Sequence, residues 1–175
     1  ASEGVSRLVL TLSVAQSIIT LVYSGVGSMA TQKWAYGNKN ISFFMTGGTP
    51  FLGNTVTIND PGTYTFYYTD EEGNEYLKRI SVVKDDIKPP VVELYKEFGI
   101  VALITDADLQ IKKYEIGQHP LEYFYDNGKF FVGNSIKLTV AGTYTLYYKL
   151  ANGLDYVQEF EMLESDLDPF GWEVK

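Results

Sequence analysis

The chain has 175 residues, of which 45% are hydrophobic, with no cysteine, one histidine and a formal net charge of −8. This apolar content is enough for a packed core, whereas the missing cysteines exclude a disulfide scaffold or a thiol nucleophile, and the single histidine excludes a multi-histidine zinc site. The whole excess of acid lies in residues 85–175. An acidic chain repels phosphate backbones, so the composition argues against nucleic-acid binding and against most enzymes, and no apolar run predicts a membrane span.

An internal repeat determines how the chain is organised. When the sequence is laid over itself so that position 62 meets position 142, segment 62–68 (Gly-Thr-Tyr-Thr-Phe-Tyr-Tyr) coincides with segment 142–148 (Gly-Thr-Tyr-Thr-Leu-Tyr-Tyr). Self-similarity at a fixed period is the signature of a repeated structural unit. We therefore expect two homologous domains and two further segments: residues 1–84 and 91–164 as domains, 85–90 as a linker and 165–175 as a tail.

Each repeat has the pattern of an all-β domain. Short runs rich in Val, Ile, Thr, Tyr and Phe alternate with Gly, Pro, Asn and Asp, which is typical of strands and tight turns, and no sustained 3.6-residue apolar period accompanies a helix cap. This spacing predicts two tandem immunoglobulin-like antiparallel β-sandwiches of about seven strands each. The expected strands are 8–12, 18–23, 32–36, 41–44, 55–59, 63–69 and 76–83, then 91–95, 100–104, 111–115, 121–125, 135–139, 143–149 and 156–162.

Alternation along the sixth strand of each repeat identifies core positions, because successive side chains of a strand point to opposite faces. Its Gly-Thr-Tyr start resembles the tyrosine corner of immunoglobulin-like sandwiches, in which the hydroxyl of a Tyr returns to the upstream backbone. Two residues further on, an apolar side chain stands where an antibody domain has a cysteine. The third strand supplies an aromatic residue in the place of the core Trp. The expected core positions are Trp34, Tyr64 and Phe66 in the first repeat and Tyr114, Tyr144 and Leu146 in the second.

Four motifs of the first repeat point to a family. They are Lys33–Gly37 (Lys-Trp-Ala-Tyr-Gly), Phe43-Phe44, Gly62–Thr65 (Gly-Thr-Tyr-Thr) and Asp70–Glu75 (Asp-Glu-Glu-Gly-Asn-Glu). Together they resemble the bacterial Ig-like repeats of Gram-positive cell-surface and S-layer-type proteins. The second repeat departs from this pattern at Lys113–Gly117 and at Leu150–Asp155. The resemblance implies a location outside the cell, at its surface, and an architectural or adhesive role. It names no catalytic residue.

Loop carboxylates near the expected domain junction are candidate calcium ligands. Calcium takes six to eight oxygen ligands, and a site of this kind would make tandem modules more rigid. The loops lack the ligand spacing of an EF-hand, and the alternative is that they only keep the protein soluble. No other cofactor is expected. The candidates are Asp85, Asp86, Asp106, Asp108 and Asp155.

Aromatic residues outside the expected core are candidate binding residues. Tyr67 and Tyr147 alternate away from the core, and Phe43 and Tyr123 lie beside a second aromatic residue on a predicted strand. Outward rings can stack on sugars or anchor a protein partner, whereas the alternative is that they form stabilising cross-strand pairs. The repeated lysines Lys33 and Lys113 are expected to point outward, and His119 to be exposed.

These observations predict a non-catalytic structural or adhesive segment of a bacterial surface protein: a spacer, stalk or lattice module. Its partners would be neighbouring Ig-like repeats of the same protein, together with a cell-wall glycan or a host or partner protein. The alternatives are a carbohydrate-binding accessory module of a secreted glycan-active enzyme and a decoration domain of a phage or pilus particle. An aromatic platform on one flat face would favour the carbohydrate alternative.

The tail echoes the linker, because Asp166–Pro169 follows the pattern of Asp86–Pro89 at the same offset that relates the two domains. We therefore expect that the tail begins a further repeat and that the chain is cut from a longer array. The alternative is that Phe170 and Trp172 fold back over an edge strand or an apolar patch.

Overall fold

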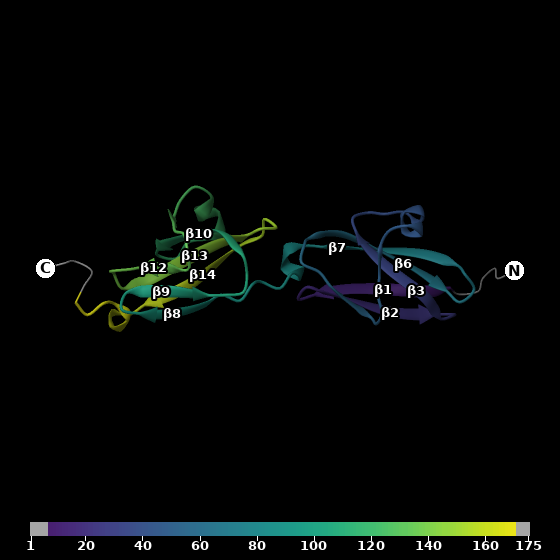
Figure 1. Ribbon diagram of the computed structural model, residues 1–175, viewed down its shortest axis with the longest axis horizontal. Coiled ribbons are helices and arrows are strands. Elements are labelled where there is room, and N and C mark those ends of the chain that lie inside the picture. Colours follow the sequence, from purple (N-terminus) through teal and green to yellow (C-terminus); the bar gives the residue numbers. More distant parts are fainter. Residues whose placement is uncertain (1–6, 171–175) are drawn as a thin grey trace. The chain divides into compact units, whose positions relative to one another are not determined.

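The computed structural model describes residues 7–170, and the chain divides into two compact units between Lys88 and Pro89 (Figure 1). Each unit contains one three-stranded and one four-stranded antiparallel sheet, and the described residues contain no α-helix. This arrangement confirms the all-β prediction and fits a β-sandwich. Among residues 7–170, no helix has the length and apolar character needed to cross a membrane.

The first unit pairs its strands out of sequence order, so that distant segments share a sheet. The three-stranded sheet has the order β1-β2-β5 and the four-stranded sheet the order β4-β3-β6-β7. All pairs are antiparallel, and the β3–β6 pair shifts register between Met29 and Thr31. The strands are β1 (Leu8–Ala15), β2 (Ile18–Gly25), β3 (Met29–Tyr36), β4 (Thr49–Pro50), β5 (Thr55–Thr57), β6 (Gly62–Asp70) and β7 (Glu75–Val82).

The second unit repeats this plan element by element. Its sheets have the orders β12-β9-β8 and β11-β10-β13-β14, and the β10–β13 pair shifts register at the equivalent place, between Leu109 and Ile111. The predicted repeat is therefore visible in the topology. The strands are β8 (Glu93–Glu97), β9 (Ile100–Ile104), β10 (Leu109–Ile116), β11 (Lys129–Phe130), β12 (Ser135–Lys137), β13 (Gly142–Leu150) and β14 (Asp155–Met162).

The inner faces of the sheets form the cores, and they contain the sixth-strand residues that the alternation pattern predicted to be buried. Phe66 and Leu146 are at most 1% exposed. The predicted returns of the two tyrosine hydroxyls are confirmed, because Tyr64 donates to the Asp60 carbonyl at 2.6 Å and Tyr144 to the Val140 carbonyl at 2.7 Å. On the third strand of each unit, Trp34 and Tyr114 are only half-buried, so their contribution to the cores is smaller than expected.

Two predicted strands, 41–44 and 121–125, are instead the 3₁₀ helices η1 (Ile41–Met45) and η3 (Leu121–Tyr125). The Asn40 side chain accepts a hydrogen bond from the Phe43 amide and so caps η1, a role for which Asn is favoured. An aromatic pair has the composition of a strand, but in η1 the Asn40 cap and the glycines that follow favour a tight helical turn. The helix η3 follows Pro120 and has no side-chain cap. Both helices bury one Phe completely, Phe44 in η1 and Phe124 in η3.

The first unit extends beyond the expected boundary at residue 84. A third 3₁₀ helix, η2 (Lys84–Asp86), is followed by Ile87, which is 6% exposed. The Asp86 carbonyl accepts a hydrogen bond from the Ser17 amide at 2.8 Å, and the Lys88 amide donates to Ser17 Oγ at 2.8 Å. The expected linker at 85–90 therefore begins only after a closing segment, residues 84–88, that packs on its own unit.

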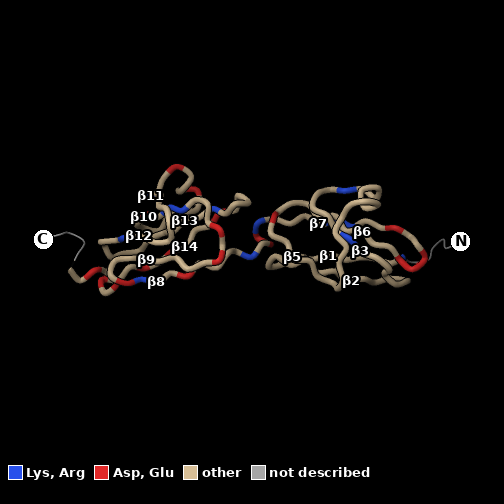
Figure 2. Tube along the Cα trace, in the orientation of Figure 1, with Lys and Arg blue, Asp and Glu red and all other residues tan. Residues whose placement is uncertain are grey.

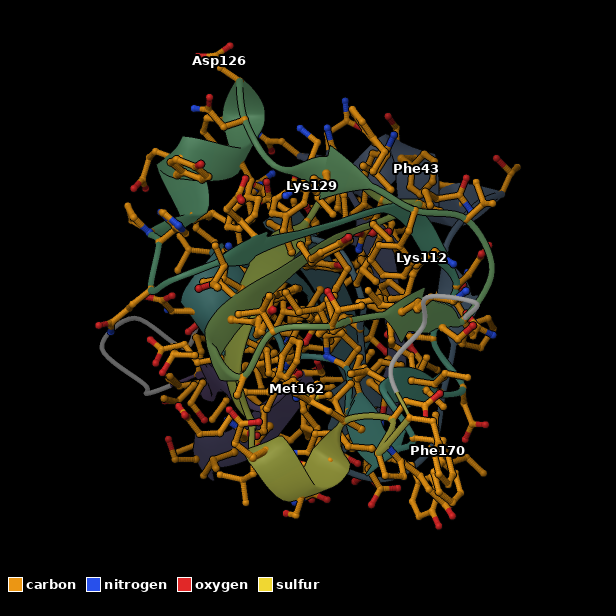
Figure 3. The ribbon with its side chains drawn as sticks, turned by 90° about the vertical axis from the view of Figure 1, so that its left-hand side faces the viewer. Phe43, Lys112, Asp126, Lys129, Met162 and Phe170 are labelled. Carbon is orange, nitrogen blue, oxygen red and sulfur yellow. The ribbon has the colours of Figure 1, made fainter. Side chains whose placement is uncertain are left out.

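The second unit closes in the same way. The helix η4 (Glu164–Asp166) presents the Asp166 carbonyl to the Gly99 amide at 2.7 Å, and Leu167 packs against the core. The first residues of the expected tail at 165–175 thus belong to this unit. Phe170 is 86% exposed and covers no apolar patch, whereas Trp172 lies outside the described residues (Figure 3).

Candidate functional site

Tyr67 does not lie on a binding surface. It is 6% exposed, and its ring stacks on Phe44 of η1 with centroids 5.2 Å apart and 11° between the planes. Its hydroxyl donates to Glu75 Oε2 at 2.7 Å, and burial together with this bond raises the pKa of Tyr67 to about 12. The prediction of an outward Tyr67 is wrong because η1 covers the second face of β6.

Tyr147 repeats this arrangement in the second unit. It is 4% exposed, stacks on Phe124 of η3 at 5.3 Å and donates to Asp155 Oδ2 at 2.9 Å. Burial, assisted by the bond to Asp155, raises the pKa of the Tyr147 hydroxyl. The prediction that Tyr147 points outward is therefore also wrong.

Phe43 is half-buried on η1 rather than outward on a strand. Its ring meets Phe44 edge to face at 5.2 Å, and the Lys39 ammonium lies 4.7 Å from its centroid. The Phe43 ring is thus in contact with side chains of its own unit and does not form an open platform for a ligand.

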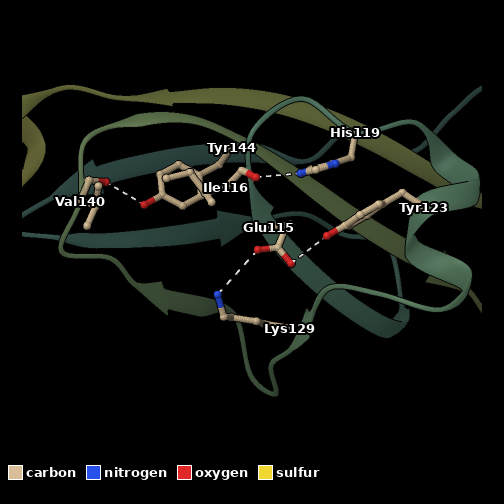
Figure 4. Close-up of polar contacts among 7 residues, drawn as sticks. All are labelled: Glu115, Ile116, His119, Tyr123, Lys129, Val140 and Tyr144. Carbon is tan, nitrogen blue, oxygen red and sulfur yellow. Dashed lines mark hydrogen bonds and ion pairs between the residues drawn. The ribbon is translucent and has the colours of Figure 1, made fainter.

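Tyr123 is likewise in contact with side chains of its own unit (Figure 4). Its ring stacks on His119 with centroids 3.9 Å apart, and its hydroxyl donates to Glu115 Oε1 at 3.3 Å. His119, expected to be exposed, is half-buried and also bonds the Ile116 carbonyl at 2.7 Å. Burial, with the nearby Glu115 charge, raises the pKa of Tyr123. These contacts fix the loop that leads into η3.

The repeated lysines point inward, contrary to expectation. Lys33 is half-buried and donates to the Phe44 carbonyl at 2.8 Å. Lys113 is only 7% exposed and donates to the carbonyls of Phe124 and Asn127. A buried ammonium needs partners, and the carbonyl groups at the end of a 3₁₀ helix lack partners within the helix. Each lysine therefore fastens its 3₁₀ helix to the sheet.

The candidate calcium ligands do not form a cluster, and two of them make other hydrogen bonds. Asp86 Oδ2 accepts from the Val83 amide at 2.9 Å, and Asp155 holds the Tyr147 hydroxyl. Within residues 7–170, no three or more Asp, Glu, His or Cys residues are grouped to hold a metal ion. Calcium binding stays a prediction. The remaining candidates, Asp85, Asp106 and Asp108, are exposed.

Asp70 organises the β6–β7 hairpin. Its carboxylate accepts hydrogen bonds from the amides of Glu72 and Asn74, both at 2.9 Å, from Asn74 Nδ2 at 2.9 Å and from the Tyr76 hydroxyl at 2.8 Å. These bonds, led by the one from the Asn74 side chain, lower the pKa of Asp70 to about 2. Asp70 of the acidic motif thus stabilises the hairpin to which it belongs.

An exposed aromatic patch lies on the β8–β9 hairpin. Tyr95 is 59% exposed and Phe98 56% exposed. Together with Glu97, Ile100 and Ala102 they line a shallow hollow of about 400 Å³, which we call the aromatic face. The Tyr95 hydroxyl donates to Glu97 Oε1 at 2.8 Å, which holds the ring beside a carboxylate and raises the pKa of Tyr95.

Phe98 has an unfavourable backbone conformation. Its φ is +54°, a region that bulky side chains rarely adopt, and the equivalent hairpin of the first unit has φ +51° at Gln16. A strained residue normally needs compensation from its surroundings. The ring of Phe98 is largely exposed and gains little packing, so the aromatic face is a candidate for contact with a partner.

The aromatic face was not predicted from the sequence. The predicted binding residues were aromatic residues that occur in both repeats. Tyr95 and Phe98 stand where the first unit has Ser13 and Gln16, once the shorter following loop of the second unit is taken into account. The signal that could have found them was therefore a departure from the repeat. Residues that repeat serve the common fold, whereas residues that differ are free to serve one unit only.

No protein-family model matches the chain, and no curated protein matches it. Among solved structures, the chain is similar to Tp47, the 47-kilodalton lipoprotein of Treponema pallidum, with 11% sequence identity and a TM-score of 0.29. The similarity covers 87% of this chain and 50% of that chain, so it spans about half the length of the lipoprotein.

Proposed function

We propose that the chain is a non-catalytic structural and adhesive segment of a bacterial surface protein. Its two units are immunoglobulin-like sandwiches that work outside the cell as a spacer, stalk or lattice module. The observation that supports this proposal most is the repetition of the same internal polar contacts in both units. Polar groups that repeat in this way maintain a fold, which is what a modular architectural protein requires.

Thr65 and Thr145 illustrate the repetition. Each is fully buried on the sixth strand of its unit, and each hydroxyl donates at 2.7 Å to the carbonyl of the glycine that follows the third strand, Gly37 or Gly117. Each oxygen also accepts an amide hydrogen bond at 3.0 Å from the loop that follows. The polar interior thus fastens loops to sheets in both copies.

Stretching single molecules by their two ends tests the mechanical part of this proposal. We expect two separate unfolding steps, each releasing about 25–30 nm, because about 80 residues extend by roughly 3.5 Å each. A single step, or extension without resistance, would contradict a spacer built from two independent units. Protease treatment of intact source bacteria tests the location: the chain should be digested before lysis, and protection until lysis would overturn a surface location.

The aromatic face favours a second candidate function, a carbohydrate-binding accessory module. Exposed rings beside a carboxylate suit a sugar, whose C–H groups stack on aromatic faces and whose hydroxyls donate to carboxylates. Binding to insoluble chitin, cellulose and peptidoglycan tests this. Tyr95→Ser with Phe98→Gln, which restores the residues of the first unit, should abolish retention, whereas Tyr125→Ser, at another exposed tyrosine, should not. Equal retention of both variants would remove this function.

A further inference from the structure

The two units differ in the side chains that lie beside the tyrosine corner. In the first unit, Tyr36 packs edge to face on Tyr64 at 5.1 Å, and its hydroxyl donates to the Pro61 carbonyl at 2.7 Å. Trp34 lies 5.8 Å from the same Tyr64 ring. These three rings pack together beside the tyrosine corner, where Tyr36 is 53% exposed.

In the second unit, smaller side chains leave this space open. Tyr114 replaces Trp34 and Ile116 replaces Tyr36. A Cβ atom at Gly62 would collide with the Tyr36 hydroxyl, whereas at the equivalent Gly142 the nearest atom is Ile116 Cδ1 at 3.8 Å. The result is a cavity of about 240 Å³, which we call the Tyr114 cavity. It is lined by Tyr114, Ile116, Lys129, Lys137, Leu138 and Tyr144, with Thr139 and Val140.

The same cavity has acquired positive charge. Lys129 and Lys137 stand where the first unit has Thr49 and Thr57, and no Asp or Glu is among the lining residues. Residues 85–175 carry sixteen acidic and eight basic residues, and acidic positions predominate along this part of the trace (Figure 2). The two lysines at the cavity contrast with this excess of acid. The Lys129 ammonium lies 5.9 Å from the Tyr114 ring centroid and 3.7 Å from Glu115 Oε2, with which it forms an ion pair (Figure 4).

We propose that the Tyr114 cavity binds one sugar ring that carries a carboxylate, such as a hexuronic acid residue. The volume is below the range of about 300–1,000 Å³ of sites for drug-sized ligands, so it suits a single ring. The ring of Tyr114 and the side chain of Ile116 provide apolar contact for the sugar C–H groups. Lys129 and Lys137 provide the charge that pairs with the carboxylate.

This site is separate from the aromatic face in its chemistry, and it goes beyond the structural role proposed above. The four differences between the units act together: two enlarge the space and two supply lysines. Random loss of packing explains an enlarged space, but it does not explain why both added polar residues at its edge are cations. Lys129 already pairs with Glu115 at 3.7 Å, and a bound carboxylate would be a further partner for the two cations.

Nuclear magnetic resonance titration of the full chain with sodium glucuronate tests the proposal. Backbone amide signals of residues 114–116 and 138–140 should shift, with a Kd of about 1 mM because so small a ligand makes few contacts. Glucose, which lacks the charge, and acetate, which lacks the ring, should each shift these signals at least tenfold less at equal concentration. Equal shifts with glucose or with acetate would overturn the proposal.

Ile116→Tyr is the decisive variant, because the first unit shows that a tyrosine fits at this place next to a glycine. It should abolish the glucuronate shifts while leaving the melting temperature unchanged or higher. Ile111→Tyr, which adds the same ring at an exposed site on β10, should bind normally. Lys129→Thr with Lys137→Thr should weaken binding at least fivefold and remove its salt dependence. Glucuronate shifts that persist in the tyrosine variant, or an unchanged Kd in the double threonine variant, would refute the site. Failure of glycan retention at Tyr95 would leave it unaffected.

Discussion

Where β6 of the first unit ends, Asp70 accepts four hydrogen bonds, whereas the second unit has Leu150 at the same position. The backbone of the two turns is nevertheless alike. The Asp70 amide donates to the Asn74 carbonyl at 3.1 Å, and the Leu150 amide to the Leu154 carbonyl at 2.8 Å. The turn is therefore set by backbone pairing and its glycine, and the carboxylate network is an addition that one unit has and the other lacks.

A second pair of positions shows what the fold does require. Gln32 donates from its side-chain amide to the Gly53 carbonyl at 2.7 Å, and Lys112 donates from its ammonium to the equivalent Gly133 carbonyl. The acceptor is the same in both units, although the donor is neutral in one and charged in the other. The carbonyl of this loop thus accepts a side-chain hydrogen bond in both units, and the chemical type of the donor is free to change.

The largest expected effect concerns the phenylalanines beneath the two 3₁₀ helices. Phe44→Ala and Phe124→Ala should each destabilise their own unit by about 3–5 kcal/mol, because each ring is fully buried and stacked. Chemical denaturation followed by residue-specific amide signals would separate the two units. A loss of stability in both units from a single substitution would show that they are not independent.

The lysines beneath these helices should distinguish the units. Lys113→Met should destabilise the second unit by about 1–3 kcal/mol, because it leaves buried carbonyl groups without a donor. Lys33→Met should have a smaller effect, since water reaches the half-buried site and can replace the ammonium. Thermal melts of both variants, with exposed Lys78→Met as control, would measure the difference. Equal effects at Lys33 and Lys113 would contradict the role assigned to burial.

The tyrosine corners should respond equally. Tyr64→Phe and Tyr144→Phe each remove one hydrogen bond to an upstream carbonyl, which is worth about 1 kcal/mol. Urea unfolding of the two variants would compare them. A clearly larger loss in one unit would mean that the surroundings of that corner, and not its hydrogen bond, determine its contribution.

The last expected effect concerns Asp70 and depends on pH. Its folded pKa of about 2 lies below the unfolded value of about 3.9, so its stabilising contribution is complete above about pH 4 and is lost as the pH falls towards 2. Asp70→Asn should therefore reduce the acid sensitivity of the first unit only. Urea midpoints measured between pH 2 and pH 6 would test this, with exposed Asp126→Asn as control (Figure 3). An unchanged pH profile would contradict the assignment.

Features that repeat along the chain could be predicted from the sequence. The internal self-similarity indicated the two units, alternation identified Phe66 and Leu146 as core residues, and the Gly-Thr-Tyr motif predicted the tyrosine hydrogen bonds. Local pattern and long-range packing agree at these positions, so a pattern argument is sufficient.

Features that depend on what covers a sheet could not be predicted. Tyr67 alternates outward on β6, yet η1 folds over it, and no period of two reveals a cover made by another segment. The same cover turns Lys33 from a surface residue into a structural donor. The Tyr114 cavity also depends on distant contacts, because Ile116 is unremarkable until its neighbours are known.

The closing segment at 84–88 has a consequence for how such modules are copied. Because the Asp86 carbonyl is bonded to Ser17 and Ile87 is buried, the last residues of the unit complete its own surface and do not belong to whatever follows. A gene segment that is duplicated or transplanted with its end after Lys88 carries this closure with it. A segment cut at residue 84 would instead expose an apolar patch and leave the amide of Ser17 without its acceptor, so recombination is expected to tolerate the first boundary and to select against the second.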